Sequence, residues 1–177
     1  MHILDIAENS IKAEARKIAI TIEESKKKDL ITVKIEDDGK GMDEATIARA
    51  LDPFFSTKKE RRIGLGLSLL KEAAKASNGR FSLESKIGKG TRVEATFQAS
   101  HIDTKPLGDM PQTLITLIMG NPEVDLVYRH ITDESDFSMD TAELKAQLNG
   151  IRINSPEVLN IIKNKIKEGL DNLRRLI

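Results

Sequence analysis

The sequence has no cysteine and no net charge, and each absence excludes a class of chemistry. Without a cysteine among its 177 residues, the chain can form no disulfide, no thiolate metal site and no thiol nucleophile, and this composition fits a reducing cytoplasm. Lys plus Arg and Asp plus Glu both number 28, so the formal net charge is zero. No global field therefore attracts the protein to nucleic acid or anionic lipid, and any polyanion must be bound by a local site.

Long apolar runs are also missing. The longest uncharged stretch, Met110–Pro122, is shorter than the roughly 20 apolar residues needed to cross a bilayer. The amino terminus, MHILDIAENS, has acidic residues inside its apolar stretch and so differs from the basic and then apolar layout of a signal peptide. We therefore predict a cytoplasmic protein that binds neither membrane nor nucleic acid.

Apolar periodicity predicts alternating helices and hairpins over the first 99 residues. Residues 3–15 and Ser68–Ser77 have helical spacing, and Gly79 stands where a left-handed helix cap would form. One predicted hairpin pairs residues 18–22 with 31–35, and a second pairs residues 80–85 with 91–97. A short helix is predicted over residues 43–51. Together they predict an α+β fold, a two-layer α/β sandwich whose mixed, largely antiparallel sheet is covered by helices on one face.

The remaining residues predict a smaller α/β extension. EVDLVYRHI alternates like a strand, Asp140 would cap a helix that ends at Gly150, and Ser155 would cap a longer helix with an apolar stripe. We therefore divide the chain into a domain of residues 1–99 and an extension of residues 100–177. We expect the extension to pack on or complete the first domain, or to mediate partner or homodimer contacts.

Two glycine-rich turns stand at the ends of predicted elements. IEDDGKGMD, residues 35–43, ends the second strand with two carboxylates and two glycines, and GLGLS leads into the helix that starts at Ser68. Glycine lets the backbone approach a ligand closely, and the amide groups at a helix start favour phosphate. Neither turn fits a Walker loop or the G-x-G-x-x-G fingerprint. A different kind of nucleotide site is therefore indicated.

The motifs DIAENSIKA, DDGKGM, DPFFSTK, IGLGLSLLKEAAKASNG and GKGT follow one another along residues 1–98. Their order and spacing resemble the N box, the F box and the glycine-rich boxes of the GHKL superfamily, which joins type II topoisomerases, heat-shock chaperones, histidine kinases and mismatch-repair ATPases. The later motifs look most like the ATP-binding domain of histidine kinases, the HATPase_c type. The resemblance implies ATP and Mg²⁺ as ligands.

The resemblance assigns roles around the adenine. Asp37 matches the carboxylate that accepts a hydrogen bond from the adenine amino group, and Gly39, Gly41 and Met42 belong to the wall beside it. Thr91 matches the hydroxyl that supports adenine through water. An ordinary strand threonine is the structural alternative at that position.

The resemblance also assigns roles on the phosphate side. Asn9 matches the ligand of Mg²⁺, since an amide oxygen is a hard and neutral ligand, and its alternative is a helix-surface residue. Lys12, Lys58 and Arg62 are candidates to face the phosphates, or are merely solvated. Asp5 takes the place of the glutamate that polarises the attacking water in hydrolytic branches, which implies slow hydrolysis. Its alternative role is to stabilise the helix amino terminus through the helix dipole.

The lid region departs from the family pattern. Phe54 would anchor the lid, but Arg62 stands where the family usually has a glycine, so the lid is stiffer or the arginine replaces backbone amides as a phosphate partner. The upstream dimerisation and phosphoacceptor helices of histidine kinases are absent. The strand and first helical turns that precede the N box in those kinases are missing too, and we expect the extension to cover the sheet edge that this strand would occupy. The resemblance implies four further nucleotide contacts in the second glycine-rich box, Gly64, Leu65, Gly66 and Leu67.

The function implied is that of an Mg²⁺-dependent, ATP-binding regulatory protein. It resembles the separate anti-sigma-factor kinases, which transfer the γ-phosphoryl group to a partner protein in trans. The alternative is a protein-binding module that is switched by ATP. In that case a lid at residues 52–63 orders around ATP and presents a surface to another protein, and the ATP is hydrolysed slowly. A second alternative is self-phosphorylation at His101, because SHIDTKPL resembles the phosphoacceptor box SHELRTPL. Pro106 and Pro111 favour a linker there instead of the long helix that this box needs.

Overall fold

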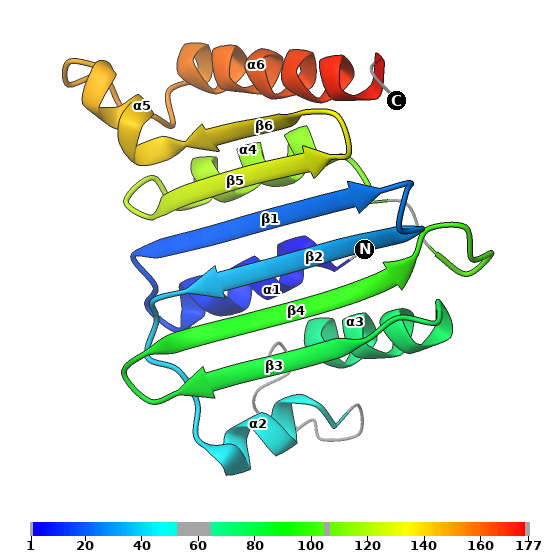
Figure 1. Cartoon of the computed structure of the whole chain (residues 1–177). Coiled ribbons are helices and arrows are strands. Elements are labelled where there is room, and N and C mark those ends of the chain that lie inside the picture. The colour runs from blue at the N-terminus through cyan, green and yellow to red at the C-terminus, as the bar shows by residue number, and fades with distance from the viewer. Residues whose placement is uncertain (1, 53–64, 105–106, 176–177) are drawn as a thin grey trace.

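In the part of the chain that the structure describes, six strands form one mixed sheet, and helices cover one of its faces (Figure 1). The computed structural model describes residues 2–52, 65–104 and 107–175. The strand order across the sheet is β3-β4-β2-β1-β5-β6. The elements in chain order are α1 (Ile3–Lys12), β1 (Lys17–Ser25), β2 (Leu30–Asp37), α2 (Glu44–Ala50), α3 (Leu65–Ala76), β3 (Phe81–Lys86), β4 (Gly90–Gln98), α4 (Met110–Gly120), β5 (Asp125–Thr132), β6 (Asp136–Asp140), α5 (Thr141–Gln147) and α6 (Pro156–Arg175).

The strand pairing agrees with the predicted fold class. β1 pairs antiparallel with β2 on one side and parallel with β5 on the other, and the remaining neighbours are antiparallel. Figure 1 places α1, α3 and α4 behind the sheet, so the mixed, largely antiparallel two-layer α/β sandwich is confirmed. β5 covers the edge of β1 over eight residue pairs, from Lys17 opposite Asp125 to Glu24 opposite Thr132. The boundary at residue 99 stays a prediction.

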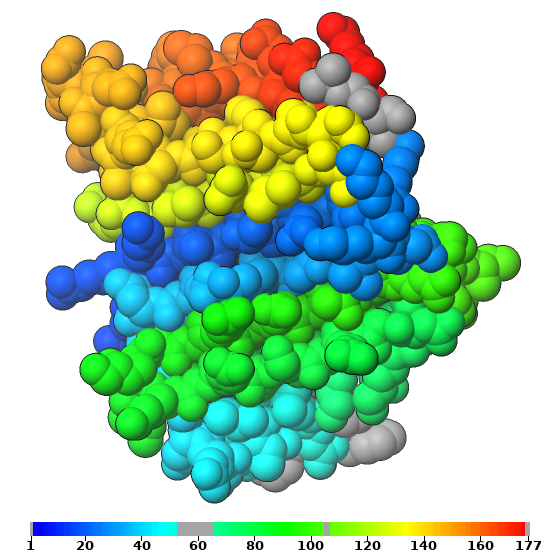
Figure 2. Space-filling model, in the orientation of Figure 1, coloured from blue at the N-terminus to red at the C-terminus, as the bar shows by residue number. Residues whose placement is uncertain are grey.

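The two faces of the sheet differ because side chains alternate along each strand. Ile18, Ile20 and Ile22 of β1 are at most 1% exposed on the helix side, where Ile3 and Ile6 of α1 join the same core. Figure 2 shows the opposite face, which no helix of the described residues covers, as bands of side chains running from β6 to β3. Ion pairs on this face join Lys34 to Glu36, Arg92 to Glu94 and Arg129 to Asp136. The uncovered face is thus polar, and its charges are largely neutralised by neighbours.

Two helices end differently from the prediction. α1 ends at Lys12, three residues early, because Glu14 adopts the left-handed region (φ 61°) and closes a Schellman motif. α3 ends in the same way, but its left-handed residue is Asn78 (φ 53°), so the predicted left-handed cap at Gly79 is wrong. A Cβ on Gly79 would lie 1.7 Å from the Thr96 carbonyl oxygen. This glycine therefore permits close packing of the helix end on β4.

The later part of the chain contains elements that the sequence did not reveal. α4 and β6 were not predicted, and α4 is capped by Asp109, whose side chain accepts a hydrogen bond from Gln112 N–H. β5 confirms the strand predicted from EVDLVYRHI. The predicted cap is also confirmed, because the Asp140 side chain accepts a hydrogen bond at the start of α5. Ser155 precedes α6 as expected, but its hydroxyl is buried without a hydrogen-bond partner among the described residues, so the predicted side-chain cap does not form.

The last helix has the predicted apolar stripe, and the stripe is part of the core. Ile162, Ile166, Leu170 and Leu173 of α6 are buried, and the helix packs on α4 and β6. Val158, not predicted, is buried at the start of the same stripe, whereas Leu159 is only partly buried. In the described ranges, no helix is both long and apolar enough to span a bilayer.

A buried polar chain joins β5 to β1. His130 Nε2 lies 2.7 Å from Glu24 Oε1, and His130 Nδ1 lies 2.8 Å from the Tyr128 hydroxyl. This hydrogen bond from His130 lowers the pKa of Glu24, whereas burial raises the pKa of Tyr128. Because an ionised carboxylate only accepts, Nε2–H donates to Glu24, and a neutral ring then accepts the Tyr128 proton at Nδ1. Tyr128 and His130 are buried, and Glu24, whose side chain is 37% exposed, links them to the surface.

Candidate functional site

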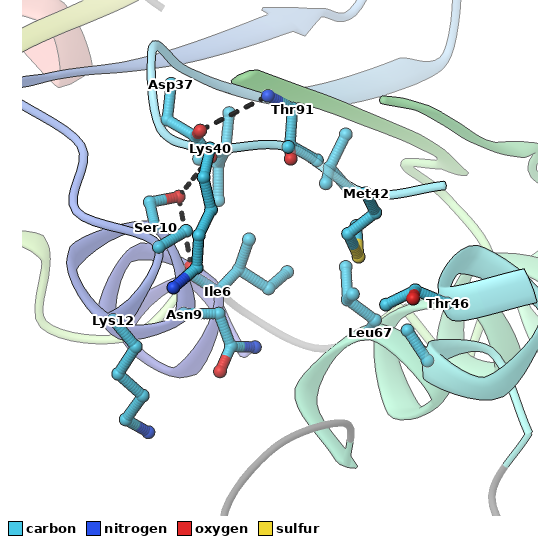
Figure 3. Close-up of a pocket in the computed structure, with 15 residues that line it drawn as sticks. Ile6, Asn9, Ser10, Lys12, Asp37, Lys40, Met42, Thr46, Leu67 and Thr91 are labelled. Atoms are coloured by element: carbon cyan, nitrogen blue, oxygen red, sulfur yellow. Dashed lines mark hydrogen bonds between the residues drawn. The ribbon is translucent and has the colours of Figure 1, made fainter. Parts of the chain in front are cut away.

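A cavity of about 250 Å³ lies at the end of β2 where the motifs meet (Figure 3). Its volume is near the lower end of the range of roughly 300–1,000 Å³ for ligand pockets. Apolar side chains form most of the wall, and a few polar groups face in, which is the usual composition of a small-molecule site. The lining residues are Ile6, Asn9, Ser10, Lys12, Ala13, Ile35, Asp37, Lys40, Gly41, Met42, Thr46, Ala50, Leu67, Thr91 and Val93.

Asp37 is held by three hydrogen-bond donors at the last position of β2. Its Oδ1 accepts the backbone N–H groups of Gly39 (3.0 Å) and Thr91 (3.2 Å). Its Oδ2 accepts the hydroxyl proton of Ser10 at 2.6 Å, as Figure 3 shows. An ionised carboxylate offers roughly four acceptor positions. About one position therefore remains for a donor on a bound ligand, and the carboxylate is oriented before that ligand arrives.

Asp38, the second carboxylate of the turn, has a different task. Its Oδ1 accepts the backbone N–H groups of Arg16 and Lys17, each at 2.8 Å. It thereby fastens the start of β1 to the end of β2. The paired acids of IEDDGKGMD thus divide into one residue that lines the cavity and one that holds the sheet together.

Two glycines allow the backbone segments around Asp37 to approach each other. Gly41 has φ +66°, and a Cβ there would lie 2.0 Å from the Lys86 carbonyl oxygen. Gly90 has φ +83°, and its Cβ would lie 1.8 Å from the Asp37 carbonyl oxygen. Any other residue at either position would be strained and would force the turn away from β3 or β2.

Two serines near Asp37 were not among the predicted site residues. Ser10 is 4% exposed and orients Asp37, and Ser85 on β3 contacts the turn and the start of β4. Ser85 Oγ lies 2.8 Å from Met42 N, 2.9 Å from Gly90 O and 2.9 Å from Thr91 Oγ1. The available signal for Ser10 was a hydroxyl on the apolar face of a helix. Ser85 gave no comparable signal, because its partners come from two other segments, the glycine-rich turn and the start of β4.

α1 supplies the residues on the second side of the cavity. Asn9 and Lys12 line the cavity and stand three positions apart, on one face of the helix. Asp5 is one turn earlier, is 56% exposed, and has its Oδ2 3.0 Å from His2 Nδ1. Among the described residues that line the cavity, Asp5 is absent. A Cβ on Gly66 would lie 2.8 Å from the Asp5 Cβ, so the first turn of α3 packs directly on this part of α1.

α2 closes a further side of the cavity and is anchored by its own cap. Asp43 accepts a hydrogen bond from the backbone N–H of Thr46 at 2.8 Å. Hydrogen bonds from Thr46, first from its side chain and then from its backbone, lower the pKa of Asp43. The carboxylate therefore stays ionised and keeps the helix start in place, so that Thr46 and Ala50 line the cavity.

The predicted site residues thus fall into three groups. Asn9, Lys12, Asp37, Gly41, Met42, Leu67 and Thr91 line one cavity, and Gly39 binds Asp37 through its backbone. Leu65 and Gly66 begin α3, and Asp5 lies beside them outside the lining. Within the described ranges, no three His, Asp or Glu side chains cluster in a way that could hold a metal ion. The predicted contacts Phe54, Lys58, Arg62 and Gly64 lie outside the described residues.

His101 lies at the far end of the sheet from Asp37. Register places Thr91 opposite Asp37 and Gln98 opposite Leu30, so β4 runs from the cavity toward His101. β2 has 8 residues and is therefore roughly 25 Å long. Residues 100–104 form turns instead of a helix, and Thr104 Oγ1 donates to the Gln98 carbonyl at 2.6 Å.

Comparison with known proteins identifies the family. The family model of histidine kinase-, DNA gyrase B-, and HSP90-like ATPases matches residues 2–101. The chain is similar to sporulation kinase C of Bacillus subtilis, with 32% identity over 88 residues, which are 50% of this chain and 20% of that protein. It is also similar to sensor protein kinase FleS of Pseudomonas aeruginosa (37% over 89 residues, 50% and 22%) and to sensor histidine kinase YvrG of Bacillus subtilis (31% over 94 residues, 51% and 16%).

The chain spans about a fifth of the length of these relatives, and the similarity lies in the part that carries the cavity. The family match covers more than half of the chain and includes every described residue of the cavity wall. The relatives are named as kinases, and the family supports an ATP-binding, kinase-like domain here. The chain belongs to the family of histidine kinase-, DNA gyrase B-, and HSP90-like ATPases.

Proposed function

We propose that this protein binds ATP with Mg²⁺ and transfers the γ-phosphoryl group to a partner protein in trans. The observation that carries the proposal is the oriented Asp37 carboxylate, which has about one acceptor position open at the end of an apolar cavity. In a chain of this family, that arrangement suits a base that offers an amino group. Adenine offers one where guanine offers a carbonyl oxygen.

The walls of the cavity suit a flat aromatic base. Ile35 of β2 and Val93 of β4 are directly opposite each other in the sheet, and both line the cavity. Ile6 and Leu67 line it from the two helices, and Met42 lines it from the turn. Apolar side chains of this kind exclude water from both faces of a base, so its amino group is left to bind Asp37.

Asn9 and Lys12 would hold the charged end of the nucleotide. The Asn9 amide oxygen is a hard, neutral ligand that suits Mg²⁺ shared with phosphate oxygens. Lys12 adds a positive charge one turn along the same face of α1. When bound, ATP supplies the transferable phosphoryl group, and the task of these residues is to orient it and neutralise its charge.

Transfer to a partner is favoured over rapid hydrolysis by the position of Asp5. Its carboxylate is 56% exposed, is paired with His2 and does not line the described cavity, so Asp5 is not placed to polarise water there. The same observation supports the second candidate function, an ATP-switched protein-binding module with slow hydrolysis. Self-phosphorylation at His101 within one chain is disfavoured by its place at the far end of the sheet.

One experiment separates these functions. The protein is titrated with ATP by calorimetry, with Mg²⁺ and with EDTA, and is then incubated with γ-labelled ATP, Mg²⁺ and candidate partner proteins. Label on a partner, dependent on this protein, is the expected result. Slow ADP release without any labelled protein would favour the binding module. Label on the protein itself that disappears in His101→Gln would make it a self-phosphorylating kinase, and no ATP binding would refute the whole proposal.

A further inference from the structure

Ser85 lies behind the cavity wall and uses every hydrogen-bonding position of its hydroxyl. A serine hydroxyl has one proton to donate and two lone pairs that accept. Its three neighbours are the Met42 backbone N at 2.8 Å, the Gly90 carbonyl at 2.9 Å and the Thr91 hydroxyl at 2.9 Å. The serine thus has as many partners as it has positions.

The chemistry of these partners fixes the direction of each hydrogen bond. The Gly90 carbonyl can only accept, so Ser85 gives its proton there. The Met42 backbone N–H can only donate, so it occupies one lone pair of Ser85. With the Ser85 proton on the Gly90 carbonyl, the second lone pair of Ser85 remains for the Thr91 hydroxyl, which is then the donor in the Ser85–Thr91 pair.

This direction determines what Thr91 offers to a ligand. Because its only hydroxyl proton is bound to Ser85, Thr91 presents lone pairs alone to the cavity that it lines. Asp37 likewise presents only acceptor positions, and the Gly39 and Thr91 backbone N–H groups beside it already bind its Oδ1. The Met42 N–H is occupied by Ser85. These groups together form a wall that accepts hydrogen bonds and offers none.

We propose that Ser85 is a specificity-determining positioning residue, which holds the Thr91 hydroxyl as an acceptor so that the wall selects a purine with an amino group at position 6. The inference rests on the proposed ATP site. An amino group at that position donates directly to these acceptors. An oxo group at the same position, as in inosine or guanine, would meet lone pairs and is rejected.

The test is the ratio of affinities for ATP and ITP, measured by calorimetry. In Ser85→Ala the Thr91 hydroxyl is free to rotate and to donate to the oxo group of ITP. The ATP to ITP affinity ratio should fall roughly three- to tenfold, the range that one hydrogen bond provides. Ser85→Thr keeps one proton and two lone pairs on a strand position that suits threonine, and should retain the wild-type ratio. Ser82→Ala, an exposed serine on the same strand, is the matched control.

The ratio separates positioning from general damage, because a loosened fold would weaken both nucleotides equally. In a Thr91→Val background, Ser85→Ala should cause no further change in the ratio. An unchanged ratio in folded Ser85→Ala, or a further change in that background, would overturn the inference. If Ser85→Ala does not fold, Thr91→Val decides: an ATP to ITP affinity ratio equal to that of the wild type would show that the Thr91 hydroxyl does not discriminate at position 6, and would overturn the inference. Failure of the wild type to bind ATP would refute the proposed function, and the inference with it.

Discussion

Asp37→Asn is expected to remove ATP recognition while the fold survives. The change replaces one carboxylate oxygen by an NH₂ group and removes the charge. The asparagine carbonyl can stay at the Oδ1 position and keep both backbone donors, Gly39 and Thr91. Ser10 can then accept from the new amide and turn its own proton to the Ile6 carbonyl, which already lies 3.4 Å from its hydroxyl. Every buried group near the substitution keeps a partner, so we expect a loss of stability of only about 1 kcal/mol.

The loss of affinity follows from what the ligand meets. A hydrogen bond to a charged group contributes roughly 1.5–3 kcal/mol, which corresponds to roughly 10- to 150-fold in the dissociation constant. The new NH₂ group is itself a donor and would face the adenine amino group, so the loss should lie toward the upper part of this range. ITP should be weakened less than ATP, since the amide can donate to its oxo group.

Calorimetric titration with ATP and Mg²⁺ measures the effect, and urea unfolding checks the fold. Asp38→Asn is the matched control, because it makes the same chemical change one residue away. Asp38 binds Arg16 and Lys17 through a single oxygen, which an asparagine carbonyl can replace. That variant should bind ATP as the wild type does. Wild-type ATP affinity in folded Asp37→Asn would refute the assignment of the adenine wall.

Three further outcomes are expected. Asn9→Ala should make ATP binding insensitive to Mg²⁺, and the assignment fails if EDTA leaves binding by the wild type unchanged. His130→Ala should destabilise the protein by roughly 2–4 kcal/mol in urea unfolding, since it leaves the buried Tyr128 hydroxyl unsatisfied and opens a cavity. Tyr128→Phe should reduce the free energy of unfolding less in the His130→Ala variant than in the wild type. If the two losses of stability simply add, the hydrogen-bonded chain is contradicted. The hydrogen bond from His130 lowers the pKa of Glu24 in the folded state. Glu24 therefore stabilises the folded protein at pH values above its usual pKa of 4.5, and this contribution is lost as the pH falls through the lowered pKa. Acid unfolding should therefore be steeper in the wild type than in Glu24→Gln, and equal slopes would refute this role.

Local patterns were sufficient to predict much of the sheet and of the cavity. The alternating isoleucines of β1 and β2 reveal both strands and their buried face, because that signal is repeated every second residue. Asp37 and Gly41 stand in a motif whose spacing is fixed by a single turn. Such features depend on a few neighbouring residues, which is why the alternation and the motif, with its resemblance to a known family, could point to them.

Other features depend on contacts that no local pattern records. The end of α1 could not be predicted, because Glu14 adopts a left-handed conformation that usually indicates glycine. α4 has no charged residue on any side, so its sequence lacks the alternation of apolar and charged positions that reveals a helix. With Pro111 near its start, the segment resembles a linker. Ser85 gains its importance only when β3, β4 and the glycine-rich turn meet, as its contacts with Met42 and Thr91 demonstrate.

The parallel pairing of β1 with β5 sets the order in which the protein can fold. β1 meets β2 across a short turn, but Glu24 and His130, which bind each other across the parallel pair, are 106 residues apart. Pairing over so long a loop is slow, because the entropy of closing the loop is lost before the contacts form. During synthesis at roughly 5–20 residues per second, the edge of β1 stays open for roughly 5–20 s until β5 has been made. In that interval the unfinished sheet is most exposed to pairing with another chain. Chaperones should therefore bind most strongly at the open edge of β1, and truncation of the chain before β5 should leave this edge open.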